Sequence, residues 1–184
     1  MHLRALSCLC LFLFASPALA AEWKIDPAQS QIRFSGTHAG NDFSGAFEKW
    51  EGAIQFDPQA LAASHARITV DLASAKTGNA TYDKTMPQAD WLNSGAKAEA
   101  VFETTAFTEI TPGAYKIDGK LTLREVTLPV SLDATIKIDG KKALVNAKTS
   151  LKRLDYAIGK SSDATGEWVS LEIPVEIKLV AEQQ

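Results

Sequence analysis

The feature that most constrains the fold is a regular alternation of apolar and polar side chains in the second half of the chain. Residues 128–138 carry an apolar side chain at every second position, residues 139–140 are Asp-Gly, and the alternation returns over residues 143–151. Successive side chains of a β-strand point to opposite faces, so this pattern predicts strands with one apolar face. Asp-Gly between two such segments is typical of a tight hairpin turn. A chain with this pattern must bury one face of an antiparallel sheet.

Similar segments occur along most of the chain. The alternation recurs over residues 115–123 and 171–179, and shorter versions lie at 32–34, 54–56 and 68–72. Taken together these segments predict about eight strands, mostly joined by short turns. Closing an antiparallel sheet of this size hides its apolar face and leaves an interior that holds packed side chains or one slender ligand. We therefore expect an all-β protein built as an eight-stranded antiparallel β-barrel. A barrel filled by its own side chains and a two-sheet sandwich are the alternatives.

Two segments, residues 73–98 and 152–168, interrupt the alternation. The first contains Pro87, and proline suits the first turn of a helix, so we expect one or two short helices there. The second includes Lys160, Ser161 and Ser162. A lysine beside serines invites comparison with a nucleophile and its base, but the flanking residues match no serine-nucleophile motif. We interpret this segment as a polar loop and predict no catalytic residues.

The first twenty residues have the layout of a secretory signal peptide. A basic start that includes Arg4 precedes an apolar run over residues 6–14, and Ala18-Leu19-Ala20 forms an A-x-A cleavage site. The apolar run is too short to span a bilayer, which takes about 20 residues. We expect residues 1–20 to be removed and residues 21–184 to form one domain in the periplasm. A retained membrane anchor is the alternative.

Composition then excludes several classes of function. Both cysteines, Cys8 and Cys10, lie in the predicted leader, so the mature chain has no disulfide. The formal net charge is −3 and no basic run is present, which argues against nucleic-acid binding. Outside the leader the histidines are His38 and His65, far apart in the sequence, which is too few ligands for a zinc or haem site. We expect no metal and no cofactor.

Several short motifs occur in a characteristic order. They are Trp23-Lys24-Ile25-Asp26, Ser30 to Phe34, His38, Phe43 to Phe47, Thr77-Gly78-Asn79 followed by Asp83, Asp90-Trp91, and Tyr115 with Gly119 to Val130. In this order and spacing the chain resembles the YceI family of periplasmic, lipocalin-like barrels that bind polyisoprenoid or other lipid-like molecules. The resemblance covers essentially the whole chain after residue 20. It departs from the family pattern at Gln29, Tyr82 and Glu125, where histidine, arginine and glycine are usual.

The resemblance implies a carrier for an apolar molecule of isoprenoid, isoprenoid-quinone or fatty-acyl type, and not an enzyme. Residues 36–43 and 159–170 resemble a subgroup whose members occur alone or joined to cytochrome b561-type membrane domains. A membrane redox protein is therefore one protein partner to consider, and a second copy of the chain is another. An enzyme acting on such lipids, and a non-catalytic interaction protein with a filled barrel, are the competing hypotheses.

The candidate ligand contacts combine strand phase with the family motifs. They are Phe34, His38, Phe43, Phe47, Trp50, Asp83, Trp91, Phe102, Leu121, Leu123, Tyr156 and Trp168. By phase, Phe34, Leu121 and Leu123 face the interior. His38 shares the phase of Phe34, and with Asp83 it is expected to contact a head group at one mouth of the barrel. The alternatives are a buried histidine paired with a neighbour, an aspartate that caps a helix or turn, and aromatic side chains that only fill the core.

Overall fold

The structure, a computed structural model, describes residues 20–184, so that the predicted leader lies outside the described residues except for Ala20. The strands are β1 (Ala21–Ile25), β2 (Gln31–His38), β3 (Asn41–Phe47), β4 (Trp50–Phe56), β5 (His65–Asp71), β6 (Ala75–Lys76), β7 (Glu99–Thr111), β8 (Ala114–Leu123), β9 (Val126–Asp139), β10 (Lys142–Lys152) and β11 (Glu172–Gln183). The helical elements are the α-helix α1 (Ala80–Thr85) and the 3₁₀ turns η1 (Leu61–Ala63), η2 (Leu72–Ser74) and η3 (Arg153–Tyr156).

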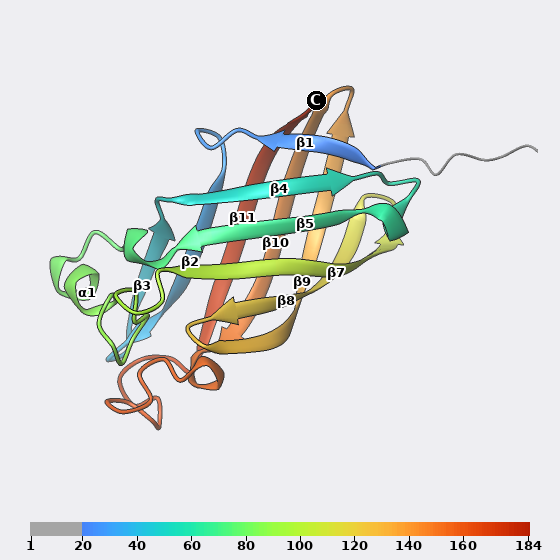
Figure 1. Ribbon diagram of the computed structural model, residues 1–184. Coiled ribbons are helices and arrows are strands. Elements are labelled where there is room, and N and C mark those ends of the chain that lie inside the picture. Colours follow the sequence, from blue (N-terminus) through green and yellow to red (C-terminus); the bar gives the residue numbers. More distant parts are fainter. Residues whose placement is uncertain (1–19) are drawn as a thin grey trace, which may run out of the picture.

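Eight of these strands form a closed antiparallel barrel, as the sequence predicts (Figure 1). The order around the barrel is β1-β4-β5-β7-β8-β9-β10-β11, and pairing of β1 with β11 from Trp23↔Gln183 to Ile25↔Ala181 completes the ring. Further along β11, strand β2 takes the place of β1 and pairs from Lys178↔Gln31 to Val175↔Phe34. Strands β3 and β6 extend the sheet beyond β2. One long strand therefore serves two successive partners on the same edge.

The registers explain why strand phase predicts the interior so well. Phe102 of β7 lies opposite Leu121 of β8, and Leu121 lies opposite Leu128 of β9. Directly paired residues share one face of a sheet, so a single apolar phase passes from strand to strand around the barrel. The predicted hairpin between β9 and β10 is present, although its two loop residues are Gly140 and Lys141 rather than Asp139 and Gly140.

The segment 73–98 holds one short α-helix, and it begins earlier than the position of Pro87 suggests. The Asn79 side chain accepts hydrogen bonds from the backbone N–H groups of Thr81 and Tyr82, which starts α1 at Ala80. The helix ends at Thr85, so the prediction that Pro87 opens a helix is wrong. Asparagine acts as the helix start here because its side chain satisfies otherwise unpaired N–H groups.

Two hydrophobic clusters occupy opposite ends of the barrel. The first, which we call the aromatic end, contains Trp23, Phe56, Tyr115 and the partly buried Phe107. Phe56 packs against Phe107 at 5.3 Å and Tyr115 at 5.7 Å between ring centroids, and the Trp23 indole N–H donates to the Phe56 carbonyl at 2.9 Å. The second cluster, at what we call the loop end, is built from Leu72, Ala100, Leu123 and Tyr156. Figure 1 shows α1 and the loop before β11 at this end.

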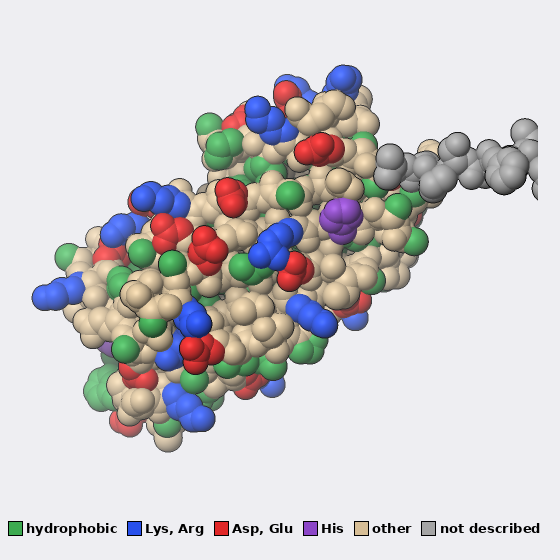
Figure 2. Space-filling model, viewed as in Figure 1, with side chains coloured by type: hydrophobic (Ala, Val, Ile, Leu, Met, Phe, Trp, Pro, Cys, Tyr) green, Lys and Arg blue, Asp and Glu red, His purple; other side chains and the backbone are tan. Residues whose placement is uncertain are grey.

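The outer surface visible in Figure 2 carries acidic and basic side chains interspersed over the strands. No helix within residues 20–184 is both long and apolar enough to cross a membrane.

Candidate ligand-binding site

The barrel encloses an apolar cavity of about 200 Å³ that runs from the aromatic end to the loop end. All eight strands of the ring, together with β2, β3, η2 and Leu92, contribute to its lining. The lining residues are Trp23, Ile32, Phe47, Ile54, Phe56, Ala66, Ile68, Val70, Leu72, Leu92, Ala100, Phe102, Thr104, Phe107, Ile117, Leu121, Leu123, Val130, Leu132, Ile136, Ala143, Val145, Ala147, Thr149, Leu151, Val175, Ile177, Leu179 and Ala181. No charged side chain is among them.

The polar atoms in this lining are few, and two of them are already paired. The Thr104 hydroxyl accepts from the Ala66 N–H at 2.7 Å and contacts the Ala66 carbonyl at 3.3 Å, next to the irregularity where β7 shifts register against β8. The Trp23 indole N–H is paired with the Phe56 carbonyl. Since a buried polar group needs a partner, pairing these groups within the wall leaves an interior suited to hydrocarbon.

Four of the candidate ligand contacts line this cavity: Phe47, Phe102, Leu121 and Leu123. Phe102 is positioned by the absence of a side chain at Gly119 on the neighbouring strand, where a Cβ atom would lie 2.5 Å from the phenylalanine ring. Gly119 pairs with Thr104, two residues from Phe102, so the phenylalanine ring has room to lie across β8. The two leucines reach the cavity on the phase that the sequence predicts, and Phe102, which pairs with Leu121, shares their face.

Three other aromatic candidates lie outside the lining. Phe34 packs against Phe47 at 5.2 Å between ring centroids and lies over Gly45, where a Cβ atom would be 2.4 Å from its ring. Phe43 packs against Tyr82 of α1, with centroids 6.0 Å apart. Trp50, the first residue of β4, pairs with Val70, which lines the cavity, but Trp50 itself does not. These rings lie where β2 and β3 extend past the barrel or where β4 begins.

His38 and Asp83 each have a protein partner and neither lines the cavity. The His38 Nδ1 atom lies 3.1 Å from the hydroxyl of Tyr82, the residue that replaces the family's usual arginine. The Asp83 carboxylate accepts from the Thr77 N–H and the Thr77 hydroxyl, both at 2.7 Å. The backbone N–H of Thr77, with its hydroxyl, lowers the pKa of Asp83. These contacts match the alternatives of a paired histidine and an aspartate that fixes a turn.

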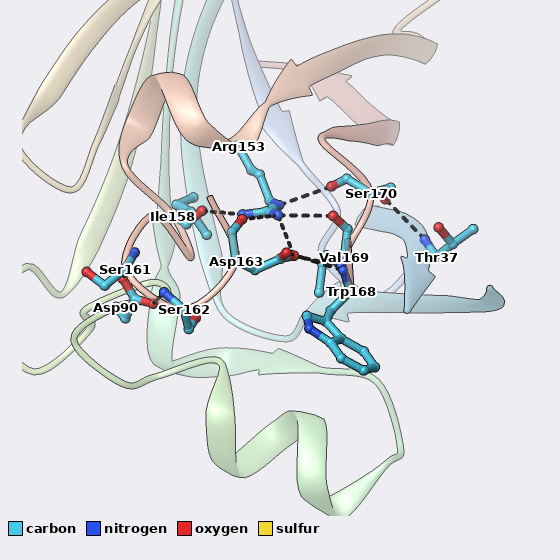
Figure 3. Close-up of polar contacts among 10 residues, drawn as sticks. All are labelled: Thr37, Asp90, Arg153, Ile158, Ser161, Ser162, Asp163, Trp168, Val169 and Ser170. Carbon is cyan, nitrogen blue, oxygen red and sulfur yellow. Dashed lines mark hydrogen bonds and ion pairs between the residues drawn. The ribbon is translucent and has the colours of Figure 1, made fainter. Parts of the chain in front are cut away.

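The remaining candidates, Trp91, Tyr156 and Trp168, come from the two loops at the loop end. The Trp91 ring lies beneath the Arg153 guanidinium, 5.9 Å from its centroid. Tyr156 is 2% exposed and belongs to the cluster at this end. Trp168 is 54% exposed, and its indole projects away from the polar contacts that its backbone makes (Figure 3).

An ion pair that the sequence did not reveal anchors the loop before β11. Arg153 donates from Nη2 to the Asp163 Oδ2 atom at 2.7 Å, and the two side chains are 2% and 3% exposed. The same guanidinium donates to the backbone carbonyls of Ser170, Ile158, Asp163 and Val169 at 2.8–3.1 Å (Figure 3). One arginine therefore donates to five acceptors of this loop, including the carboxylate of its buried ion-pair partner.

Asp163 is correspondingly held in its charged form. Burial by itself raises the pKa of Asp163, but the N–H groups of Val169 and Trp168 and the charge of Arg153 outweigh it, so the pKa is lowered. The N–H of Val169 donates to Oδ2 at 2.8 Å and that of Trp168 to Oδ1 at 3.2 Å. In the sequence Asp163 lies ten residues from Arg153 within an irregular loop, so no periodicity indicates that the two side chains meet.

A second set of contacts ties the two loops together. Asp90, from the first loop, accepts from the N–H groups of Ser161 and Ser162 at 3.0 and 2.9 Å, and from the Ser162 hydroxyl at 2.6 Å. Burial opposes these bonds, but their net effect lowers the pKa of Asp90. Arg124 donates to the carbonyls of Ala89 and Ala157, one on each loop. The polar Lys160-Ser161-Ser162 stretch thus serves to join loops.

No grouping of three or more histidine, cysteine, aspartate or glutamate side chains with metal-binding geometry occurs among residues 20–184.

Comparison with known proteins supplies the family. The model of the YceI-like domain matches residues 23–181. This chain belongs to the YceI-like family. The UPF0312 protein of Ectopseudomonas mendocina is 32% identical over 173 residues, 89% of this chain and 91% of the relative. Protein YceI of Escherichia coli O157:H7 is 31% identical over 175 residues, 90% of this chain and 91% of the relative.

Solved structures of related barrels agree with the fold. Campylobacter jejuni YceI is 28% identical with a TM-score of 0.65, covering 76% of this chain and 84% of that one. BcnA of Burkholderia cenocepacia matches with a TM-score of 0.82 at 24% identity, over 85% of this chain and 99% of that one. A polyisoprenoid-binding domain from Saccharophagus degradans matches with a TM-score of 0.68 at 15% identity, over 90% and 99%. The resemblance to the YceI family, inferred from the sequence motifs, is confirmed by the family match and these relatives.

Proposed function

We propose that this YceI-like protein is a non-catalytic carrier that holds a long apolar molecule inside its barrel. The observation that carries the proposal is the cavity, whose lining is apolar along its length and lacks any charged group. An isoprenoid, isoprenoid-quinone or fatty-acyl chain suits such a lining because it has no polar groups along its length. The structural neighbour described as a polyisoprenoid-binding domain supports this class of ligand.

Burial alone supplies enough free energy for retention. A chain that hides ~400 Å² of apolar surface gains up to ~10 kcal/mol at about 25 cal/mol per Å². Ordering and association remove a large part of this gain, and micromolar or tighter binding remains. No bond in the ligand has to be made or broken, which fits a protein for which we propose no catalytic residues.

The decisive experiment compares the cargo of two variants. Ala147, buried in the cavity wall, is changed to Phe, and its exposed neighbour Lys148 receives the same change as a control. Organic extraction and native mass spectrometry of protein purified from the periplasm then measure bound lipid per chain. We expect near-stoichiometric lipid in the wild type and in K148F, and a large loss in A147F, with all three folded by circular dichroism.

Other outcomes would point to the competing functions. Lipid retained equally in both variants would contradict binding in this cavity. A barrel without lipid in all three proteins would favour the filled-barrel interaction protein, whose partner would be a membrane redox protein. Conversion of an added isoprenoid lipid by the wild type would favour an enzyme.

We also propose that the protein acts in the periplasm after removal of residues 1–20. Intact-mass measurement of secreted protein is expected to give an N-terminus at Ala21. Soluble protein that keeps residues 1–20 would contradict this. Whether two copies associate is measured on the same material by light scattering.

A further inference from the structure

Tyr156 carries an unusual hydroxyl group. Its side chain is 2% exposed, and within residues 20–184 its Oη atom is the single buried side-chain nitrogen or oxygen without a hydrogen-bond partner. Native proteins keep few such groups because a buried donor that has left water gains nothing in return. The hydroxyl therefore needs a reason to be retained where phenylalanine would pack equally well.

The position of Tyr156 connects it with the cavity. It packs in one cluster with Leu72, Ala100 and Leu123, and all three of these residues line the loop end of the cavity. Leu92, a half-buried loop residue, both lines the cavity and packs against this cluster. The cluster that contains Tyr156 thus adjoins the loop end of the cavity through these shared residues.

The surrounding charges limit what kind of head group could lie there. Arg153, three residues before Tyr156, already donates to the Asp163 carboxylate and to four backbone carbonyls. Arg124 donates to the carbonyls of Ala89, Asp90 and Ala157. The charge of Arg153 is therefore paired with that of Asp163, and the hydrogen bonds of Arg124 are directed at backbone carbonyls. Burial, together with the nearby charge of Asp155, raises the pKa of Tyr156, so its hydroxyl stays protonated and can donate.

From this geometry we propose that the Tyr156 hydroxyl donates a hydrogen bond to a neutral carbonyl oxygen at the head of the apolar ligand, of the kind that quinone, ketone and ester groups carry. The inference rests on the proposed carrier function and adds the chemistry of the head group and the end of the barrel at which it lies. It assigns the tail of the ligand to the aromatic end.

The test is a two-by-two cycle of protein and probe. The probes are a long-chain methyl ketone and the alkene of the same length in which a methylene group replaces the carbonyl oxygen. Each is measured by displacement of a hydrophobic fluorescent dye from delipidated wild-type protein and from Y156F. We expect Y156F to weaken the ketone roughly tenfold, the size of one hydrogen bond in a buried site, and to leave the alkene unchanged.

Two controls separate this role from a structural one. Y115F makes the same change at the aromatic end, where Tyr115 packs on Phe56, and it should not distinguish the two probes. The melting temperature of ligand-free Y156F should be equal to or above that of the wild type, because the hydroxyl has no protein partner to lose. A monoalkyl phosphate of the same length should bind more weakly than the ketone.

The outcomes are distinguishable. Equal effects of Y156F on ketone and alkene, as expected if a bound water is the partner of the hydroxyl, would overturn the head-group assignment and leave the carrier function standing. Tighter binding of the phosphate than of the ketone would also overturn it. Failure of the wild type to bind either probe would overturn the carrier function itself.

Discussion

The two ends of the barrel are closed by different physical means. At the aromatic end, rings from four strands meet, and the one side-chain hydrogen bond among them runs from Trp23 to the Phe56 carbonyl. At the loop end, Leu72, Leu123 and Tyr156 form a smaller apolar cluster beneath two loops that are held by Arg153, Arg124 and two carboxylates. One end is sealed by the barrel strands themselves, the other by segments placed over it.

This difference bears on how a carrier could load. Opening the aromatic end would break packing between strands that also pair in the barrel, so it would disturb the whole sheet. Opening the loop end breaks side-chain contacts to loop backbone and leaves the ladder of the ring strands intact. Local opening draws on regions that have few buried apolar contacts. We therefore expect cargo to enter and leave past the two loops.

The largest expected effect on stability comes from removing Arg153, which holds the loop before β11. Arg153→Met leaves Asp163 charged, buried and without its cation, and should lower the free energy of unfolding by about 3–5 kcal/mol. The control is Arg67→Met, which removes the arginine of the exposed Arg67–Glu103 pair. This change should alter the free energy of unfolding by less than about 1 kcal/mol. Urea denaturation measures both. Equal losses would mean that the buried ion pair does not stabilise this end.

The second-largest loss of stability is expected from truncating a core side chain at the aromatic end. Ile117 is buried in this cluster, and Ile117→Ala should cost about 2–4 kcal/mol through lost burial and the cavity left behind. Its exposed neighbour Lys116, on the outer face, should tolerate alanine within about 0.5 kcal/mol. Native-state hydrogen exchange should show that Ile117→Ala weakens protection around the whole ring. Weakening confined to β8 would contradict cooperative closure of this end.

Strand phase explains which interior residues, and how much of the fold, could be predicted from the sequence. Leu121 and Leu123 were assigned to the interior because a two-residue period determines the face of every residue in a strand, and β8 is regular there. The closed ring followed from the number of such segments. Trp91, a candidate from its family motif, lies in irregular backbone, and pattern does not predict its contacts with Arg153 and with Gly159, whose φ is +67°.

The contacts at the loop end could not be predicted from the sequence for a related reason. Its contacts join residues such as Asp90 and Ser162 that lie in irregular backbone, where no repeating pattern relates sequence position to direction. His38 continues the phase of β2, but α1 covers that strand with Tyr82, which pattern alone does not reveal. Periodicity thus predicts the cavity wall and leaves its cover undetermined.

Acidic pH should loosen one end of the barrel and not the other. Asp90 and Asp163 have pKa values lowered below the ordinary 3.8 by hydrogen bonds that outweigh their burial. A lowered folded-state pKa gives stability that is present above the unfolded value and lost as pH falls through the folded one. The loop end should therefore loosen below about pH 3.8 while the aromatic end, closed by uncharged rings, keeps its protection.

Hydrogen exchange at a series of acid pH values measures this separation. Asp90→Asn removes the carboxylate that binds Ser161 and Ser162 and should flatten the pH dependence of protection in residues 157–163. Loss of protection at both ends over the same pH range would contradict independent closure.

The smallest effect is expected at Trp168, and it tests whether this residue is a ligand contact or only part of the cover. Its backbone N–H donates to Asp163 and its carbonyl accepts from the Ala39 N–H, so the structural contacts of this position survive truncation of the side chain. Because the indole is 54% exposed, Trp168→Ala should change the free energy of unfolding by less than about 0.5 kcal/mol. Trp91→Ala is the matched comparison, and loss of its stacking on Arg153 should cost about 1–2 kcal/mol. If Trp168→Ala leaves stability unchanged but releases cargo, the indole contacts the ligand as it passes the loop end; unchanged retention would assign the residue to the surface.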